Sequence, residues 1–515
     1  MVLPQDFFNE DERRVPSVSL SGMPSLLDVK ALRTSYLVPN FHLHLMPDQA
    51  VVSPPGDELF WNAPGTADYY RQQQTSGSHP NRFAKYPSKQ AVRQMQFVNQ
   101  SGRDIYSLID GSRTGEEIYQ AVLAKNNEPY GKFHDEIYGF FQNVVHYKHA
   151  FPAKEKTNAM YAFAGSEEFF VPIHAAVEIT ANCNARCKHC YGSFGHARQG
   201  MLSTDTTIGL LRKLRNDGVR TVEMTGGECS THPGFATILE ECVRLFDLVA
   251  ILTNGIAIDD NVFRIAEENA SKLFVQICIN GRRDYHDDFV QFKGAFDRSS
   301  QNITRFAERG VLTRGAMNLT YENGQDIEFV LNHVMNFGAS IFAPSWINMS
   351  QGRATTLHAT EDEYSCLHCF QFAEQNARIE ELEKKYPEYI RYRINDNAVE
   401  MANYDRSCGV GRRTVYVTSD GFFHLCPMAI GTNVPGYGTI ESFLSGESPW
   451  DTPFSRKIYQ LPMPSLSTCE KCDSLSTCLG CITRGIGEYL KSPAKCTWGK
   501  TNELPDLLKY ASSYQ

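Results

Sequence analysis

The sequence contains no apolar run approaching the roughly 20 residues that a membrane-spanning helix requires, so we expect no membrane-embedded segment. Basic residues are not in excess, because 59 acidic side chains outnumber 50 lysines and arginines and give a net charge of −9. A nucleic-acid-binding protein would need a basic face. The acidic start, MVLPQDFFNEDERRVPS, has no apolar signal core. We therefore expect a cytoplasmic protein that binds neither nucleic acid nor membranes.

Cysteine, by contrast, is abundant, with 15 residues. In a reducing compartment disulfides are rare, and clustered thiols usually bind metal or carry out redox chemistry. Three of the cysteines lie between residues 183 and 190, and five lie between residues 469 and 496. The sequence therefore predicts metal or redox sites in two regions of the chain.

Six strand-like segments alternate with amphipathic helical segments between residues 170 and 355. The strand-like segments are AAVEIT, TVEMTGG, DLVAILTNG, LFVQICING, RGAMNLT and SIFAPSWIN. This alternation predicts an α/β domain of right-handed βαβ units, and six units can close into a partial (β/α)6 barrel of the TIM type. Sites on such sheets form at the carboxyl ends of the strands. The loop of Cys183, Cys187 and Cys190 follows the first strand, so we expect the chemistry there.

Other segments flank this barrel. We expect an N-terminal extension, partly strand or irregular, at 1–79, a small helical module at 80–155, a helical linker at 356–404, a cysteine-rich domain of short strands with little helical periodicity at 405–500, and a C-terminal tail with some helix at 501–515. Within the helical module, Thr114 and Glu117 have capping-box spacing and predict the start of a helix.

The spacing C-x3-C-x2-C places three thiols in one short loop. Thiolates select soft metals such as zinc, copper(I) and iron–sulfur clusters. A structural zinc site is closed by four ligands, so zinc would need a further ligand such as His189 or His196. Three thiolates on a four-iron cluster would instead leave one iron uncovered for a substrate or cofactor. The spacing alone leaves both interpretations open.

Two motifs resemble those of radical S-adenosylmethionine (SAM) enzymes: CNARCKHC at 183–190 and TGGE at 225–228. The resemblance implies a 4Fe–4S cluster on Cys183, Cys187 and Cys190 whose open iron chelates SAM, and a 5′-deoxyadenosyl radical formed from SAM. It also implies SAM contacts from His189, Tyr191, Gly226, Gly227, Glu228, Cys278 and Asn280.

Each of these contacts has a structural alternative. The two glycines could serve only a tight turn, and Cys278 could be a buried small side chain, since relatives often carry Ser and Asp where this chain has Cys278 and Asn280. Beyond the last strand, Trp346, Asn348 and Arg353 could line the site, pack in the core or lie on a surface loop.

The C-terminal cysteines resemble the array of a SPASM domain, which houses two auxiliary 4Fe–4S clusters. The resemblance implies one fully ligated cluster on Cys469, Cys472, Cys478 and Cys496, and a second, with one open iron, on Cys408, Cys426 and Cys481. The chain would then hold three clusters. The C-x2-C at 478–481 departs from the usual C-x3-C of the family. Zinc staples are the alternative. Cys366 and Cys369 form another C-x2-C, which we expect to be packed helical thiols.

The helical module resembles the RiPP recognition element of peptide maturases, a winged-helix-like fold that binds an extended leader peptide along a strand edge. Across residues 80–505 the chain is similar to the sactipeptide synthases. This resemblance implies a peptide-modifying oxidoreductase that joins a cysteine sulfur of a ribosomal precursor peptide to an acceptor α-carbon. The implied partners are that precursor, bound through its leader, and an electron donor such as flavodoxin or ferredoxin.

Other functions fit the same motifs. The architecture could make a carbon–carbon crosslink or a β- or γ-carbon thioether, or epimerise a peptide residue with a cysteine such as Cys278 or Cys229 as hydrogen donor. Outside enzymes, the alternative is a zinc-stabilised peptide-binding scaffold.

Overall fold

The computed structural model describes residues 29–511 apart from a set of gaps. The gaps are residues 40, 48, 54–95, 147–148, 158–162, 196–197, 199, 321, 347–351, 357–372, 387–409, 412–413, 431–433, 470–471, 473 and 479–480. The described residues form two compact units, an N-terminal unit up to Val171 and a C-terminal unit from Pro172 onward.

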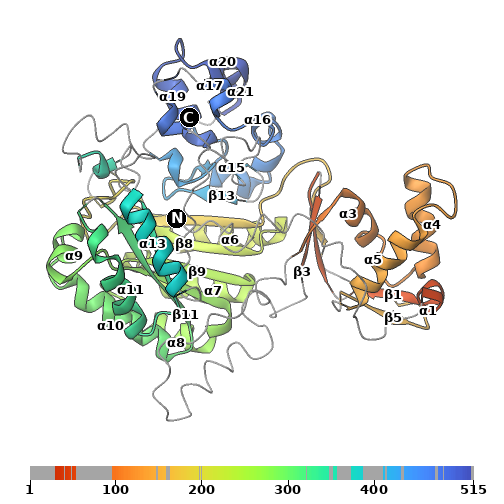
Figure 1. Cartoon of the computed structure of the whole chain (residues 1–515), viewed down its shortest axis with the longest axis horizontal. Helices are drawn as coiled ribbons and strands as arrows, with labels where there is room; N and C mark the ends of the chain where they lie inside the picture. Colours follow the sequence, from red (N-terminus) through yellow and green to blue (C-terminus); the bar gives the residue numbers. More distant parts are fainter. Residues whose placement is uncertain are drawn as a thin grey trace. The chain divides into compact units, whose positions relative to one another are not determined.

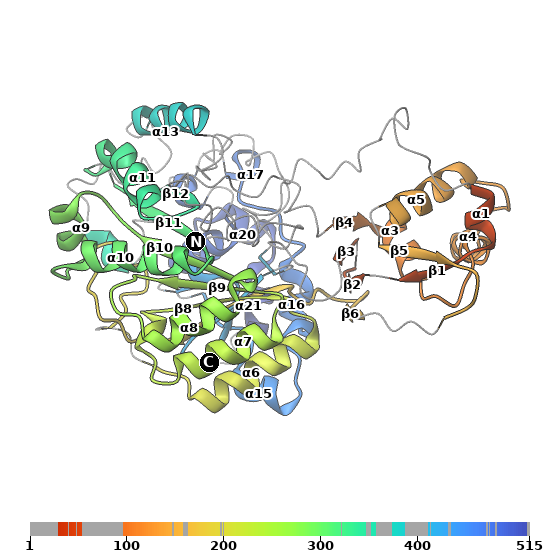
Figure 2. The ribbon, with the colours of Figure 1, turned by 90° about the horizontal axis from the view of Figure 1, so that it is seen from below.

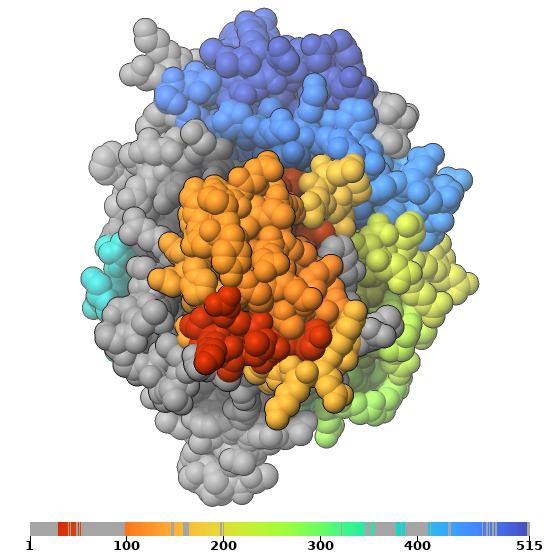
Figure 3. Space-filling view, turned by 90° about the vertical axis from the view of Figure 1, so that its right-hand side faces the viewer, coloured from red at the N-terminus to blue at the C-terminus, as the bar shows by residue number. Residues whose placement is uncertain are grey.

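The N-terminal unit combines two small sheets with helices. Strands β1 (Tyr36–Pro39) and β5 (Ala150–Ala153) pair antiparallel. A second sheet has the order β4-β3-β2-β6, with β4 at Gln96–Asn99, β3 at Gln49–Ser53, β2 at His42–Leu45 and β6 at Phe163–Gly165. The helices are α1 (Val29–Thr34), α3 (Gln100–Tyr106), α4 (Gly115–Lys125) and α5 (His134–His146). Helix α1 packs against α4 and α5, and Figure 3 shows its red surface against their orange surface.

The helices of this unit follow the predicted pattern. Thr114 caps α4, and its hydroxyl and the Glu117 carboxylate form the predicted capping box. The apolar side chains of the three helices, among them Ile105, Ile118 and Phe141, form one buried core. Strands β1, β2 and β3 come from the segment that we expected to be a separate extension. Strands β2 and β3 pair with each other, but their other partners, β6 and β4, and the partner of β1, β5, all lie beyond residue 95. Local patterns therefore did not reveal that this segment shares its sheets with the helical module.

The C-terminal unit contains the predicted partial barrel (Figure 1). Its six parallel strands are neighbours in chain order: β7 (His174–Thr180), β8 (Thr221–Gly226), β9 (Leu248–Thr253), β10 (Leu273–Cys278), β11 (Leu312–Leu319) and β12 (Ile341–Trp346). The helices between them are α6 (Thr204–Asp217), α7 (Phe235–Leu245), α8 (Asp260–Glu268), α9 (Arg283–Val290), α10 (Ala295–Glu308) and α11 (Ile327–Asn336). Figure 2 shows α6, α7 and α8 along the outside of β8 and β9.

Buried strands and capped helices explain this arrangement. All seven residues of β7 are buried, as expected for a parallel strand covered on both faces. Helix α6 begins at the Ser203 cap and ends at Gly218, whose φ of +115° suits glycine. Helix α9 was not predicted, because its sequence RDYHDDFV is polar and it buries only His286, Phe289 and Val290.

The C-terminal cysteine-rich region extends the barrel sheet. Strand β13 (Thr414–Val417) lies parallel to β7, and β14 (Phe423–His424) pairs antiparallel with β13. Short helices follow: α15 (Ile440–Ser445), α16 (Pro453–Ile458), α17 (Leu466–Cys469), α18 (Leu475–Cys478), α19 (Ile482–Lys491), α20 (Thr497–Thr501) and α21 (Leu504–Ala511). Little helical periodicity was visible at 405–500 because most of these helices are too short to show a period in the sequence, whereas α21 lies in the tail for which some helix was expected. Helix α13 (Ala373–Lys385) lies in the predicted linker.

No helix in the described part of the chain is both long and apolar enough to cross a bilayer.

The buried His286 makes stability depend on pH. Burial lowers the pKa of its imidazole from 6.5 to about 4. Between these values the unfolded chain binds a proton that the native protein does not, so stability falls as the pH drops from 7 to 5. Between pH 7 and pH 5 we expect the free energy of unfolding of His286→Asn to fall by about 2 kcal/mol less than that of the wild type. Urea unfolding at both pH values measures the difference, and an unchanged pH dependence would contradict the assignment.

Candidate functional site

The three-cysteine loop lies directly after β7, at the carboxyl end of the barrel strands. Burial raises the pKa of Cys183 to about 11, although the Ala185 N–H donates to its sulfur at 3.4 Å. Burial also raises the pKa of Cys187, and Cys183 and Cys190 raise it further. The three thiols are therefore close enough to interact electrostatically. They can all ionise only if a cation offsets their charge, as a bound metal does.

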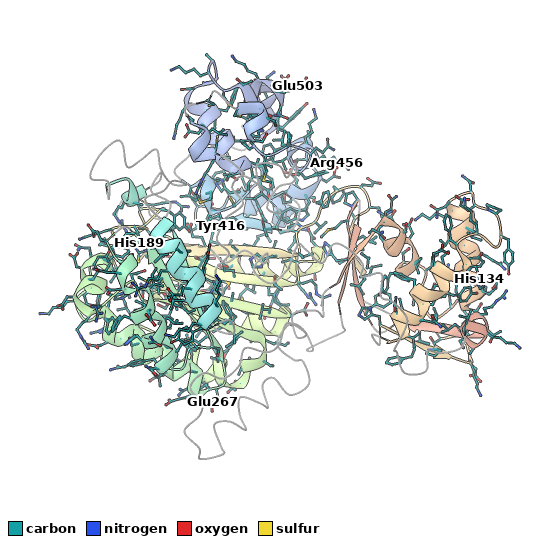
Figure 4. All side chains as sticks on the ribbon, in the orientation of Figure 1. His134, His189, Glu267, Tyr416, Arg456 and Glu503 are labelled. Atoms are coloured by element: carbon teal, nitrogen blue, oxygen red, sulfur yellow. The ribbon has the colours of Figure 1, made fainter. Side chains whose placement is uncertain are left out.

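Helix α9 supports one side of this loop. The backbone N–H groups of Arg186 and Lys188 donate to the carbonyls of Val290 and Phe289 at 3.1 and 2.9 Å. The His189 ring stacks on Phe289, with centroids 4.6 Å apart and planes 9° apart. Burial lowers the pKa of His189 to about 3, so its imidazole is neutral. The helix missed from the sequence thus fixes the backbone and ring that precede Cys190. His189 is labelled in Figure 4.

Arg353 holds the loop from the other side. It lies in the short 3-10 helix Gly352–Thr356, which follows β12. Its backbone N–H donates to the carbonyl of Cys190 and its Nε to the carbonyl of Cys187, both at 2.9 Å. A Cβ at Gly352 would lie 2.3 Å from the Cys190 oxygen. Arg353 therefore contacts the cysteine loop itself. Asn348 is outside the described residues.

The TGGE turn packs against the first residues of the cysteine loop. Gly226 has a φ of +143°, and a Cβ there would lie 2.3 Å from the Thr180 carbonyl oxygen. A Cβ at Gly227 would lie 2.3 Å from the Asn182 oxygen. The N–H groups of Gly227 and Glu228 donate to those same two carbonyls, each at 2.8 Å. Both glycines are therefore required by backbone packing, whatever ligand the turn also meets.

Glu228 joins the ends of two strands. Its side chain is 1% exposed. One carboxylate oxygen accepts from the Thr253 hydroxyl at 2.7 Å and the Ser230 N–H at 3.1 Å, and the other accepts from the Asn254 N–H at 2.7 Å. The Cys229 sulfur also lies 3.8 Å from the first of these oxygens, so the carboxylate is surrounded by donors from within the protein.

Asn318, which sequence reasoning missed, connects the predicted residues on β10 with the cysteine loop. The side-chain oxygen of Asn280 accepts from the Asn318 backbone N–H at 2.9 Å and side-chain N–H at 3.1 Å. The Asn318 amide is also 3.3 Å from Nε2 of His189, and its hydrogen bond opposes the effect of burial on the pKa of Cys278. The only signal in the sequence is a polar residue near the carboxyl end of a strand.

Two buried atoms here point to a bound group. Among the described residues, Nδ2 of Asn280 and Nδ1 of His189 have no hydrogen-bond partner. Asn280 is fully buried, and an unpaired buried polar atom is costly. A ligand rich in hydroxyl and ring nitrogen atoms would satisfy both, so the residues fit a nucleoside-containing cofactor. Tyr191 differs from the rest of the predicted set, because its hydroxyl lies 3.4 Å from that of Tyr416 on β13.

Four C-terminal thiols form one electrostatic group. Burial raises the pKa of Cys478 to about 12, and Cys469, Cys472 and Cys496 raise it further. The Cys472 N–H donates to the Cys469 carbonyl at 2.9 Å, and the Cys496 sulfur accepts from an N–H of α20, which it caps.

Cys426 lies against the first turn of α19, the helix that Cys481 caps. The Cys426 sulfur lies 3.3 Å from Oγ1 of Thr483, two residues after Cys481, and Cys481 caps α19. Cys408, Cys366 and Cys369 are outside the described residues. Within the described ranges no three Cys, His, Asp or Glu side chains converge on one metal ion. A four-iron cluster takes its thiolates on different irons, so its ligands need not meet at a point.

Comparisons with known proteins agree with this geometry. Residues 177–334 match the family model described as the Radical SAM superfamily. The chain is 26% identical to the antilisterial bacteriocin subtilosin biosynthesis protein AlbA of Bacillus subtilis, over 80% of this chain and 90% of that protein. It is 27% identical to the sporulation killing factor maturation protein SkfB of the same organism, over 52% of this chain and 62% of that protein.

The fold is similar to that of a solved structure. The crystal structure of Streptococcus suis SuiB bound to precursor peptide SuiA has a TM-score of 0.59 and 13% identity, covering 90% of this chain and 98% of that one. At this identity the likeness concerns the fold.

The close approach at Gly227 predicts a sharp effect of one methyl group. We expect Gly227→Ala to push the TGGE turn away from Asn182, to destabilise the chain by about 2 kcal/mol and to lower iron incorporation during anaerobic reconstitution. Urea unfolding and iron analysis measure both.

Gly209→Ala is the matched control, because its Cβ would sit in α6 with the nearest atom at 3.6 Å. That variant should keep its iron and gain a little stability. Equal behaviour of the two variants would contradict the packing role of Gly227.

Proposed function

We propose that this chain, whose residues 177–334 form a radical SAM domain, matures a ribosomally made precursor peptide by joining a cysteine sulfur to the α-carbon of an acceptor residue. The observation that carries the proposal is the set of three rather than four thiols at the carboxyl end of the barrel, beside the unpaired atoms of Asn280 and His189. Three thiolates suit a cluster that keeps one iron for a cofactor.

Different residues of the barrel would bind different parts of SAM. Cys183, Cys187 and Cys190 would hold the cluster, which with bound SAM supplies a radical able to take hydrogen from carbon. Asn280 and His189 would offer their unpaired nitrogens to the ribose and adenine. The TGGE turn would receive the amino group. The protein thereby supplies orientation and exclusion of water, while the cofactor carries the difficult chemistry.

The C-terminal thiols support two auxiliary 4Fe–4S clusters. Cys469, Cys472, Cys478 and Cys496, whose charges interact, would hold one completely. Cys408, Cys426 and Cys481 would hold the other with one iron open, which could take the cysteine thiolate of the peptide or the electron released when the bond closes. An electron donor such as flavodoxin or ferredoxin would supply the reducing electron.

The N-terminal unit would bind the leader of the precursor. Its four-stranded sheet ends at β4 on one side and at β6 on the other, and an extended peptide can add to such an edge through main-chain hydrogen bonds. The names of AlbA and SkfB concern bacteriocin biosynthesis and killing-factor maturation, and the SuiB structure holds a precursor peptide. These relatives support a peptide substrate.

Anaerobic incubation with SAM, a reductant and a cysteine-containing precursor peptide tests the function. We expect 5′-deoxyadenosine and a peptide that has lost two hydrogens per bond, with fragmentation placing the bond between sulfur and an α-carbon. Epimerisation would instead insert deuterium from deuterated water without loss of hydrogen, with the partly exposed Cys278 thiol as candidate donor. A peptide returned unchanged while SAM is cleaved would contradict the proposal.

Iron analysis tests the clusters separately. Three four-iron clusters require about 12 irons per chain, and the triple variant Cys183→Ala, Cys187→Ala, Cys190→Ala should retain about 8. Cys242→Ala is the control, because its buried thiol contacts only Met224 among the described sulfur atoms, and it should keep all of the iron. Zinc without sulfide in the wild type would contradict the proposal and favour the peptide-binding scaffold.

A further inference from the structure

A buried carboxylate in the barrel has a set of partners that the proposed chemistry does not use. Glu178, on β7, is completely buried. One oxygen accepts from the Ser419 backbone N–H at 3.2 Å and its hydroxyl at 2.5 Å. The other accepts from Arg198 and from the Tyr416 hydroxyl, both at 2.8 Å. Burying a charge is expensive unless it is paired and hydrogen-bonded, so all four bonds must persist together.

These partners come from segments that are distant in the sequence. Arg198 follows the cysteine loop, and it also lies 3.7 Å from the carboxylate of Asp420. Tyr416 belongs to β13, and Ser419 lies in the turn that follows it. One carboxylate therefore joins the first barrel strand, the end of the cysteine loop and the start of the C-terminal cysteine-rich region.

Tyr416 extends this connection to the cysteines themselves. Because Glu178 can only accept, the Tyr416 hydroxyl donates to it and the Tyr191 hydroxyl, 3.4 Å away, donates to Tyr416. Tyr191 directly follows Cys190. Tyr191, Tyr416 and Ile430 pack together. Ile430 directly follows the short 3-10 helix Pro427–Ala429, which begins after Cys426. Residues 426–430 are called the Cys426 segment below.

The contacts thus run without a break from Cys190 to the Cys426 segment. The Tyr416 position, where β13 joins the barrel, is marked in Figure 4.

We infer that Glu178 is a positioning residue that fixes, through Tyr416 and Tyr191, the spacing between the cysteine loop and the Cys426 segment. The inference rests on the proposed function in one respect: both segments would carry clusters that act on one bound peptide. Hydrogen removal and sulfur attachment must then occur in a single geometry. If the spacing relaxes, SAM is cleaved without a crosslink being formed.

The ratio of 5′-deoxyadenosine to crosslinks measures this coupling. In Glu178→Gln an amide nitrogen replaces an oxygen that now accepts two hydrogen bonds, and in Tyr416→Phe one donor is lost. We expect either variant to raise the ratio at least about fivefold, the factor that corresponds to one ordinary hydrogen bond. The double variant should add little, because both residues act in one network. Should Glu178→Gln fail to fold, Tyr416→Phe still decides the question.

Asp247→Asn is the matched control. Asp247 forms a buried ion pair with Arg220, and these residues precede β9 and β8, at the amino end of the barrel strands. This variant should lose stability while keeping the wild-type ratio. A ratio unchanged in Glu178→Gln, with a loss of stability like that of Asp247→Asn, would overturn the positioning role.

Hydrogen exchange of the purified chain gives a readout that does not depend on turnover. Glu178→Gln should speed exchange of amides at residues 414–430 and 200–202, and Asp247→Asn should not. Unchanged exchange in these segments would overturn the inference. A wild-type chain that forms no crosslink overturns the proposed function instead, and the exchange experiment then decides on Glu178 alone.

Discussion

Repulsion between like charges is the constraint around which the mouth of the barrel is built. Three thiolates in an eight-residue loop cannot hold one another in place, since Cys183 and Cys190 each oppose the ionisation of Cys187. The backbone that carries them must therefore be fixed from outside. Two N–H groups of the loop donate to carbonyls of helix α9, and Arg353 donates to two carbonyls of the loop. The TGGE turn donates to carbonyls of Thr180 and Asn182, just before the loop. The position of the loop is therefore set by contacts with other parts of the chain.

The polar groups at the two ends of the barrel have different surroundings. At the amino ends of the strands, Arg220 pairs with Asp247 and His174 with Thr221, and Nη2 of Arg220 has no partner among the described residues. At the carboxyl ends, Asn280 and His189 also keep nitrogens for which the described residues provide no partner. An unpaired buried polar atom is costly at either end. What distinguishes the carboxyl end is that its two unpaired nitrogens are connected through Asn318 to the cysteine loop, where a bound group could reach them.

The barrel could be predicted from the sequence because its signals are local. Apolar strands followed by amphipathic helices have a period that a short window reveals, and all six strands lie where the patterns placed them. The motifs around Cys183 and Gly226 could be found for the same reason. Helix α9 and Asn318 could not be predicted, since each matters through a contact with residues about 100 or more positions earlier in the chain. Some strand was expected at 1–79, but the pairing of β1 with β5, β2 with β6 and β3 with β4 could not be predicted, because these partners lie far apart along the chain.

Strand β13 has a consequence for how this protein can be divided. Beside β7 it covers a seven-residue, fully buried strand, and beyond it the sheet ends in β14, which is only two residues long. A barrel cut off before residue 410 would expose the edge of β7 at residues 174–177, and such unpaired edges recruit strands from other molecules. The cysteine-rich region is therefore part of the barrel's own sheet. We expect a barrel without it to self-associate. A protein of this architecture that lost the region would need another strand to pair with β7.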